Sequence, residues 1–146
     1  MAECKDSAAG RRRAGAILRG MSEENVALIR SIYDAWDREE SARDFIAADV
    51  EYVNPPYAVE PGTRHGRKSF SVVRGTYEDF EIRVERFIDA GDDVVVLARY
   101  SGTGRGSGVP VEGEHGYVWT VRDGMAAHFQ WFQSHREALE AAGLQE

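Results

Sequence analysis

Three segments in the second half of the chain decide its fold: FEIRVE at residues 80–85, VVVLARYS at 94–101 and YVWTVRDG at 117–124. Apolar and polar side chains alternate through the first, which predicts a strand with one buried face. The second is apolar on both faces at its start, which predicts a central position in a sheet. Turn sequences at 90–93 and 122–124 join neighbouring strands, so we expect antiparallel hairpins here.

A first helix is predicted from about residue 22 to residue 38, where Ser22 has the side chain of a helix N-cap. Its apolar stripe recurs at spacings of three and four and consists of Val26, Ile29, Tyr33 and Trp36. A final helix starts with the capping box of Ser134 and Glu137, and Gly143 ends it. We therefore expect a curved sheet with helices on one face and a pocket between the two.

Shorter elements are predicted between the first helix and the sheet. They are a short helix at 41–48, a brief strand at 51–53 that ends before two prolines, a loop at 57–64 and a third helix at 67–77. The last strand is predicted at 126–132.

Composition indicates one globular domain. The chain has 146 residues, of which 42% are apolar and 29% charged, and no apolar run approaches the roughly 20 residues that span a bilayer. We therefore expect no membrane partner. Cys4 is the only cysteine, so no disulfide can form within the chain, and we expect a reducing, cytoplasmic location.

The first twenty residues differ in charge from the rest of the chain. They hold five basic and two acidic residues, whereas the remainder holds 13 basic and 23 acidic residues. We predict that residues 1–20 form a disordered extension and that the domain covers 21–146. The acidic body argues against nucleic-acid binding, because contacts with phosphate supply most of that affinity.

Three motifs resemble a known family: IDAGDDVVV at 88–96, VWTVRDG at 118–124 and EALEAAGL at 137–144. With the first helix, the resemblance to the SnoaL-like group of the nuclear transport factor two-like superfamily spans residues 21–144. It implies an α+β fold of cystatin-like type. This is a cone-shaped half-barrel, in which a curved, mostly antiparallel sheet wraps around a long N-terminal helix. Members include polyketide cyclases, ketosteroid isomerase, limonene epoxide hydrolase, dehydratases and proteins with no enzymatic role.

The resemblance places Tyr52 and Asn54 at the mouth of the family's pocket. Isomerase-like members have an aspartate base at the position of Asn54, and an amide cannot take its role. The epoxide hydrolase uses a tyrosine and an asparagine here, but also an Arg-x-Asp on a central strand, where this chain has RYS at 99–101. A further acid would fall near Gln130 or Gln133. Because neutral groups replace both acids, we do not expect epoxide hydrolysis by that mechanism.

Two further residues have alternative interpretations. Tyr33 matches the oxyanion-binding tyrosine of the isomerase relatives, or it is a core aromatic of the first helix. His115 is the best acid–base candidate if the face that carries Tyr117 and Trp119 is concave, because an unperturbed imidazole titrates near neutrality. If that face is convex, His115 is a surface or dimer residue. Arg99 is a candidate for binding an oxyanion.

We expect neither a metal nor a cofactor. Glu112, Glu114 and His115 are possible metal ligands, but adjacent residues of one strand point to opposite faces. The glycine-rich stretch at 102–108 is followed by a strand, whereas a phosphate-binding loop leads into a helix. His65 lies before the third predicted helix, at the expected pocket entrance.

These observations support binding of a small hydrophobic molecule in an aromatic-lined pocket, with catalysis left open. The alternative is an isomerase, cyclase or dehydratase acting on a small polycyclic or polyketide-like carbonyl compound, for which Tyr33, Asn54 and His115 are the catalytic candidates. A third possibility is a scaffold without a pocket. The expected ligand-binding residues are Tyr33, Trp36, Tyr52, Asn54, His65, Arg99, His115, Tyr117, Trp119 and Gln130. We also predict a homodimer through the outer face of the sheet.

Overall fold

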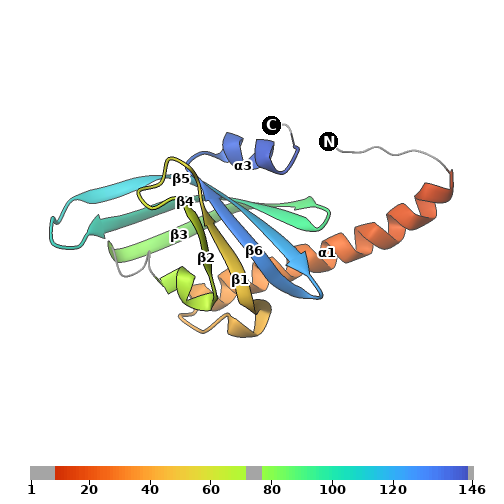
Figure 1. Ribbon diagram of the computed structural model, residues 1–146, viewed down its shortest axis with the longest axis horizontal. Helices are drawn as coiled ribbons and strands as arrows, with labels where there is room; N and C mark the ends of the chain where they lie inside the picture. The colour runs from red at the N-terminus through yellow and green to blue at the C-terminus, as the bar shows by residue number, and fades with distance from the viewer. Residues whose placement is uncertain (1–8, 72–76, 145–146) are drawn as a thin grey trace.

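The computed structural model describes residues 9–71 and 77–144 of the chain, and these residues form one six-stranded sheet (Figure 1). The strands are β1 (Ile46–Asn54), β2 (Gly62–His65), β3 (Tyr77–Ala90), β4 (Asp93–Gly104), β5 (Pro110–Arg122) and β6 (Met125–Phe132). Their order in the sheet is β2-β1-β6-β5-β4-β3. Neighbouring strands are antiparallel except for β1 and β6, which are parallel. The predicted hairpins at 90–93 and 122–124 are confirmed.

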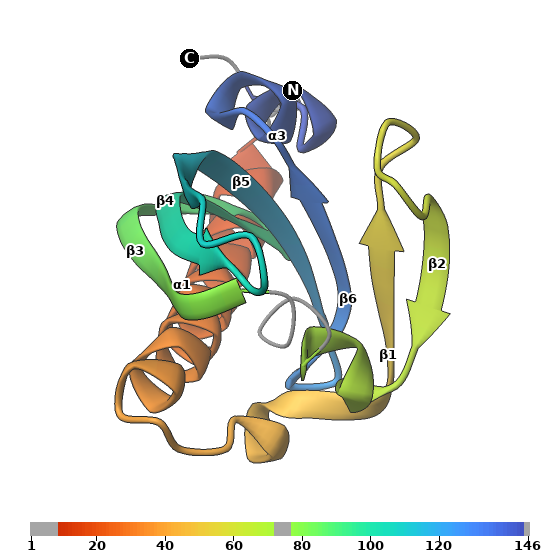
Figure 2. The ribbon, with the colours of Figure 1, turned by 90° about the vertical axis from the view of Figure 1, so that its left-hand side faces the viewer.

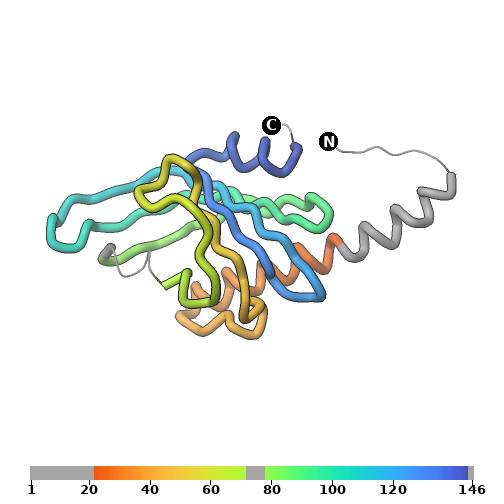
Figure 3. Tube along the Cα trace, viewed as in Figure 1, coloured from red at the N-terminus to blue at the C-terminus, as the bar shows by residue number. Residues whose placement is uncertain are grey.

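The helical elements are α1 (Ala9–Asp37), α3 (His135–Ala141) and two 3-10 turns, η1 (Arg43–Phe45) and η2 (Arg67–Phe70). The tube view follows the chain from the first helix through the turns into the sheet (Figure 3). No helix in the described part of the chain is long and apolar enough to span a membrane.

The inner face of the sheet curves around α1 (Figure 2). The predicted stripe of α1 faces the sheet, with Ile29 and Tyr33 fully or almost fully buried. From the sheet, the alternating residues Val94, Val96 and Trp119 meet the helix in the same core. The burial of each large side chain contributes roughly 1.5–3 kcal/mol to folding. The expected α+β half-barrel is confirmed.

The outer face of the sheet is covered in part by α3, so the expectation of helices on one face is wrong. Figure 1 shows α1 and α3 on opposite sides of the sheet. The outward side chains of the central strands form a second core with Ala138 and Leu139 of α3: Val95, Leu97, Val118 and Phe132. These apolar residues have an intramolecular partner and give no argument for association. The homodimer stays a prediction.

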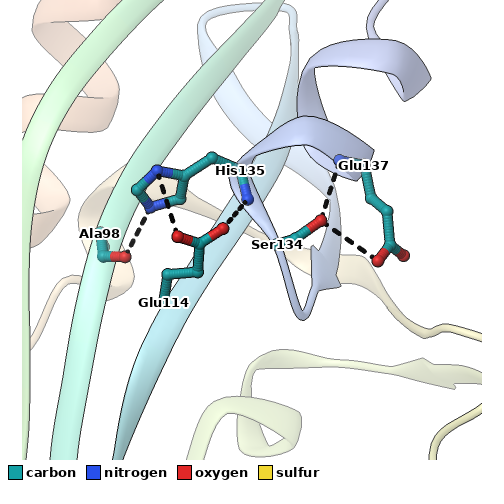
Figure 4. Close-up of polar contacts among 5 residues, drawn as sticks. All are labelled: Ala98, Glu114, Ser134, His135 and Glu137. Carbon is teal, nitrogen blue, oxygen red and sulfur yellow. Dashed lines mark hydrogen bonds and ion pairs between the residues drawn. The ribbon is translucent and has the colours of Figure 1, made fainter.

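Helix α3 is held to the sheet by polar contacts at its first turn (Figure 4). Ser134 Oγ accepts a hydrogen bond from Glu137 N at 3.1 Å, which confirms Ser134 as the N-cap. Glu114 of β5 accepts one from His135 N at 2.9 Å. His135 Nε2 lies 2.9 Å from Ala98 O, so this nitrogen carries the proton that the carbonyl accepts. The first turn of α3 thus bonds to both β4 and β5.

Several predicted boundaries differ from the structure. Helix α1 begins at Ala9 and runs through Ser22, which therefore does not cap it. Residues 1–8 of the predicted extension lie outside the described residues, and the domain boundary at residue 21 stays a prediction. The predicted helix at 41–48 is a 3-10 turn followed by β1. A register shift between Ile46 and Glu51 interrupts the pairing of β1 with β6, and such a bulge hides the alternation of a strand.

The region after Pro56 also differs from the prediction. The predicted loop at 57–64 contains the start of β2, which pairs with β1 at the edge of the sheet. Of the predicted helix at 67–77, the structure describes η2 (Arg67–Phe70) and Ser71, and residues 72–76 lie outside the described residues. Tyr77 belongs to β3, because it pairs with Gly104 rather than with a helical turn.

Replacement of Gly116 by alanine tests how closely α3 sits on the sheet. A Cβ at this position would overlap the Cβ of Ala138 and lie 3.0 Å from Ser134 O. We expect Gly116→Ala to lower the free energy of unfolding by about 1–3 kcal/mol, the usual cost of overpacking. Urea titration measures this change as a lower midpoint.

The control is a double-mutant cycle with Ala138→Gly, which removes the side chain that the new methyl group would meet. If the contact is direct, the double variant is less destabilised than the sum of the two single variants. Additive effects would contradict the close approach of α3 to β5.

Candidate functional site

A cavity of about 350 Å³ lies between α1, η2 and the inner face of the sheet. Among the described residues, thirteen side chains line it; nine of them are aromatic, and none belongs to Asp, Glu, Lys or Arg. The lining residues are Tyr33, Trp36, Tyr52, Asn54, Phe70, Phe80, Ile82, Tyr100, His115, Tyr117, Phe129, Trp131 and Gln133. The pocket is therefore an aromatic chamber with a few uncharged polar groups.

Strand alternation brings the aromatic walls together. Tyr117 pairs with Trp131 across β5 and β6, and Trp119 pairs with Phe129 one step along the same face. His115 lies on this face as well, two residues before Tyr117. The face that carries His115 is thus the concave one, which settles the alternative that the sequence left open.

The floor of the pocket is tied to α1 by a buried hydrogen bond. Trp119 Nε1 donates to the Tyr33 hydroxyl at 2.9 Å. Because this hydroxyl accepts from Trp119, its own proton is available for a further acceptor. Burial and the nearby Tyr117 hydroxyl raise the pKa of Tyr33 well above its ordinary value, so Tyr33 stays protonated. Trp119 holds the Tyr33 hydroxyl in place through this hydrogen bond and is not itself part of the pocket lining.

His115 is a neutral histidine in the pocket wall. Its ring stacks on Tyr100 with centroids 4.1 Å apart, and its Nδ1 lies 2.9 Å from the Tyr117 hydroxyl. Burial lowers the pKa of His115 to about 4, so the imidazole is uncharged at pH 7. If Tyr117 donates to Nδ1, Nε2 carries the remaining proton. In the other tautomer Nε2 is a free base.

A glycine makes the stacking of Tyr100 on His115 possible. Gly113 is the partner of Tyr100 across β4 and β5, and a Cβ there would lie 3.0 Å from the Tyr100 ring. Such a distance is shorter than ordinary van der Waals contact. The absence of a side chain at Gly113 therefore lets the Tyr100 ring lie across β5 toward His115.

Strand β1 brings the amide of Asn54 and the hydroxyl of Tyr52 to the pocket wall. Trp131 Nε1 donates to Asn54 Oδ1 at 2.6 Å, which leaves the amide NH₂ of Asn54 as a donor. Burial raises the pKa of Tyr52 to about 12, so this hydroxyl is also a donor at neutral pH. The Tyr52 ring packs against Phe129 with centroids 4.9 Å apart.

Tyr57 connects the wall of the pocket to α3. Its hydroxyl accepts from Gln133 N at 2.8 Å and donates to Glu137 Oε1 at 2.9 Å. Its ring lies edge-on to Trp131, with centroids 6.1 Å apart. These contacts fix the loop after β1 beside the two pocket residues Trp131 and Gln133.

Of the residues predicted to bind a ligand, six line the pocket: Tyr33, Trp36, Tyr52, Asn54, His115 and Tyr117. Arg99 and Gln130 do not, because each alternates with a residue that points inward, Tyr100 and Trp131 respectively. Arg99 is exposed, so its expected place in the pocket is wrong, and its role as an oxyanion ligand stays a prediction. His65 is exposed in β2 and is not part of the lining.

Sequence reasoning missed several lining residues. Tyr100 and Trp131 each lie two residues along their strand from a side chain on the inner face. Strand alternation alone could therefore have predicted that they line the pocket. Phe70, Phe80 and Ile82 come from η2 and β3, and only the tertiary arrangement brings them to the pocket. In the described ranges, no three His, Cys, Asp or Glu side chains are grouped so that they could hold a metal ion.

The curved sheet around a long helix, with an aromatic pocket between them, defines a domain of the nuclear transport factor two-like class. The family model described as SnoaL-like domain matches residues 29–129. This match covers more than half of the chain, so the chain belongs to the SnoaL-like domain family. No curated protein sequence matches the chain.

Solved structures support the same fold. An NTF2-like protein from Burkholderia thailandensis has a TM-score of 0.67 and 25% identity, over 82% of this chain and 96% of that one. TerC, co-crystallised with polyporic acid, has a TM-score of 0.64 and 22% identity, over 82% and 98%. A proposed SnoaL-like polyketide cyclase from Jannaschia sp. CCS1 has a TM-score of 0.63 and 20% identity, over 75% of this chain and 85% of that one. At such low identities, the last two show the fold alone.

The buried neutral state of His115 predicts a pH dependence of stability. Its folded pKa of about 4 lies below the ordinary value of 6.5, so between these values the unfolded chain binds more protons. Stability contributed by neutral His115 is therefore lost as the pH falls from about 6.5 to about 4. We expect His115→Gln to lose less stability than the wild type between pH 7 and pH 4.5, as measured by urea unfolding.

His65→Gln is the matched control, because His65 is exposed on β2. It should keep the pH dependence of the wild type. A His115→Gln profile parallel to that of the wild type would show that His115 is not buried in its neutral form.

Proposed function

We propose that the pocket binds a compact, neutral and mostly apolar molecule that carries a hydrogen-bond acceptor such as a carbonyl oxygen. The observation that carries this proposal is the lining, which is mostly aromatic and, in the part of the chain that the structure describes, has no Asp, Glu, Lys or Arg side chain. Its volume of about 350 Å³ is at the lower end of the range for small-molecule sites, so the ligand is small.

The polar groups of the lining favour an acceptor on the ligand. The hydroxyls of Tyr33 and Tyr52 remain protonated, and the Asn54 amide has free donors. A carbonyl oxygen that enters between these groups would recover the hydrogen bonds that it loses with water. A carboxylate would lose its hydration without meeting a cation in the lining, which costs far more free energy.

Three naphthalene derivatives of similar size test this proposal by calorimetry. We expect acetylnaphthalene, a neutral ketone, to bind at least about tenfold more tightly than naphthoate, because the pocket offers no counter-charge. Ethylnaphthalene, which lacks the oxygen, should bind through the aromatic walls alone. Tighter binding of naphthoate than of the ketone would contradict the proposed ligand class.

The variant Tyr52→Phe separates the hydrogen bond from the apolar contacts. Within the described residues the Tyr52 hydroxyl makes no hydrogen bond, so its removal should leave the fold intact. A neutral hydrogen bond contributes about 0.5–1.5 kcal/mol, so the affinity for acetylnaphthalene should fall by roughly two- to tenfold. The affinity for ethylnaphthalene, the internal control, should not fall. Equal losses for both compounds would show that Tyr52 acts through packing alone.

A second candidate function is proton transfer next to a carbonyl group, as an isomerase, cyclase or dehydratase requires. The observation that favours it is His115, the only lining side chain among the described residues that is an unprotonated base at pH 7 when Nε2 is free. Tyrosine hydroxyls from α1 and β1 would hydrogen-bond the oxygen on which negative charge develops. His115 would take the proton from the adjacent carbon and return it at another position.

Deuterium exchange tests this second candidate independently of any natural substrate. If His115 acts as a base, the methyl protons of acetylnaphthalene should exchange with D₂O in the presence of the protein, which NMR follows directly. His115→Gln should slow the exchange by roughly 10²–10⁴-fold, the usual contribution of a general base. His65→Gln should have no effect. If the ketone binds but no exchange occurs, ligand binding remains as the proposed function and proton transfer by His115 is excluded.

A further inference from the structure

A second hollow, of about 240 Å³, adjoins the main pocket and shares two lining residues with it. It is lined by Trp36 and Phe70, which both cavities share, and by residues of the two 3-10 turns. Both turns lie beside β1 at one end of the molecule (Figure 2). Unlike the main pocket, this hollow has charged residues in its wall, Arg43 and Arg67.

One of the two guanidinium groups is held in place by the backbone. Arg67 is half-buried, and its Nε donates to Ile46 O at 2.8 Å. Within the described residues, the two Nη groups of Arg67 make no hydrogen bond, so their donors can bind a ligand. Arg43 lies two residues after Ser41, and its backbone N donates a hydrogen bond to Ser41 Oγ at 3.2 Å. The Ser41 hydroxyl is the acceptor of this bond and therefore keeps its own proton as a donor.

Neither arginine has an ion pair within the described part of the chain. Two other arginines do: Arg38 pairs with Glu40, and Arg64 pairs with Glu60. The chain has a formal net charge of −7. In an acidic protein, two arginines that share one hollow without a carboxylate form a local positive site rather than part of a general basic surface.

We propose that the hollow between η1 and η2 binds an oxyanion, a carboxylate or a phosphate group, through Arg43 and Arg67. A guanidinium presents a planar fork of donors that matches the oxygens of such groups. The Ser41 hydroxyl adds a further donor, and the rings of Trp36 and Phe70 cover an apolar part of the bound molecule. This site is independent of what the aromatic pocket binds.

NMR titration of the isotopically labelled full chain tests the site with two probes, inorganic phosphate and propionate. We expect saturable shifts of the backbone amides at 41–46 and 67–71 and of the Trp36 indole. Sodium chloride at the same ionic strength should not produce these shifts. Shifts with phosphate alone or propionate alone would each support the site and identify its oxyanion.

Arg43→Gln should weaken binding by about tenfold, the size expected for a lost charged hydrogen bond. Arg122→Gln makes the same charge change at an exposed position at the end of β5 and should bind like the wild type. Arg67→Lys keeps the charge but loses the planar fork, so it should also weaken binding. The absence of saturable shifts with either probe, or equal affinities of Arg43→Gln and Arg122→Gln, would overturn the proposal.

Discussion

The hydrogen bond from Trp119 to the Tyr33 hydroxyl holds the rest of the pocket in place. It joins the centre of the sheet to the first helix at a point where both residues are almost fully buried. Without it the indole N–H would lie in the core without an acceptor, at a cost of about 1–3 kcal/mol. Because the bond uses an acceptor lone pair of Tyr33, the phenolic proton remains free toward the cavity. One contact thus stabilises the fold and supplies a donor to the site.

The uncharged lining follows from the same burial. The pocket is surrounded by aromatic rings from the helix, the 3-10 turn and the sheet, so an ionised group there would lose its hydration. The titratable groups respond by remaining neutral: the pKa of Tyr52 rises to about 12 and that of His115 falls to about 4. The described wall therefore offers hydrogen bonds and apolar contact rather than charge. The arginine-lined hollow shares the rings of Trp36 and Phe70 with the aromatic pocket. The centroids of these two rings are 5.7 Å apart.

Much of the sheet could be predicted because alternation is a local property of the sequence. Residues 80–85 and 117–124 carry a clear period of two, and the hairpin turns between strands have their usual residues. The segment at 41–53 was assigned partly to a helix, because a register shift breaks its alternation and its pairing with β6 comes from a strand far away in the chain. Local patterns do not report such long-range pairing. The placement of Arg99 was also wrong, because a family motif suggested its role while alternation with Tyr100 puts it on the outer face.

The sequence by itself determined the class of fold and the hairpins of the second half, whereas it left Tyr33 and His115 between a pocket role and a structural one. The fold class and the hairpins follow from periodicity, turn chemistry and residue type, all of which act over a few neighbouring residues. Only the tertiary structure decided which face of the sheet is concave and that α3 covers the opposite one. It also decided that Phe70 and Trp36 separate two hollows of different polarity. These features depend on sheet curvature and on contacts between distant segments, where packing of whole elements outweighs local preference.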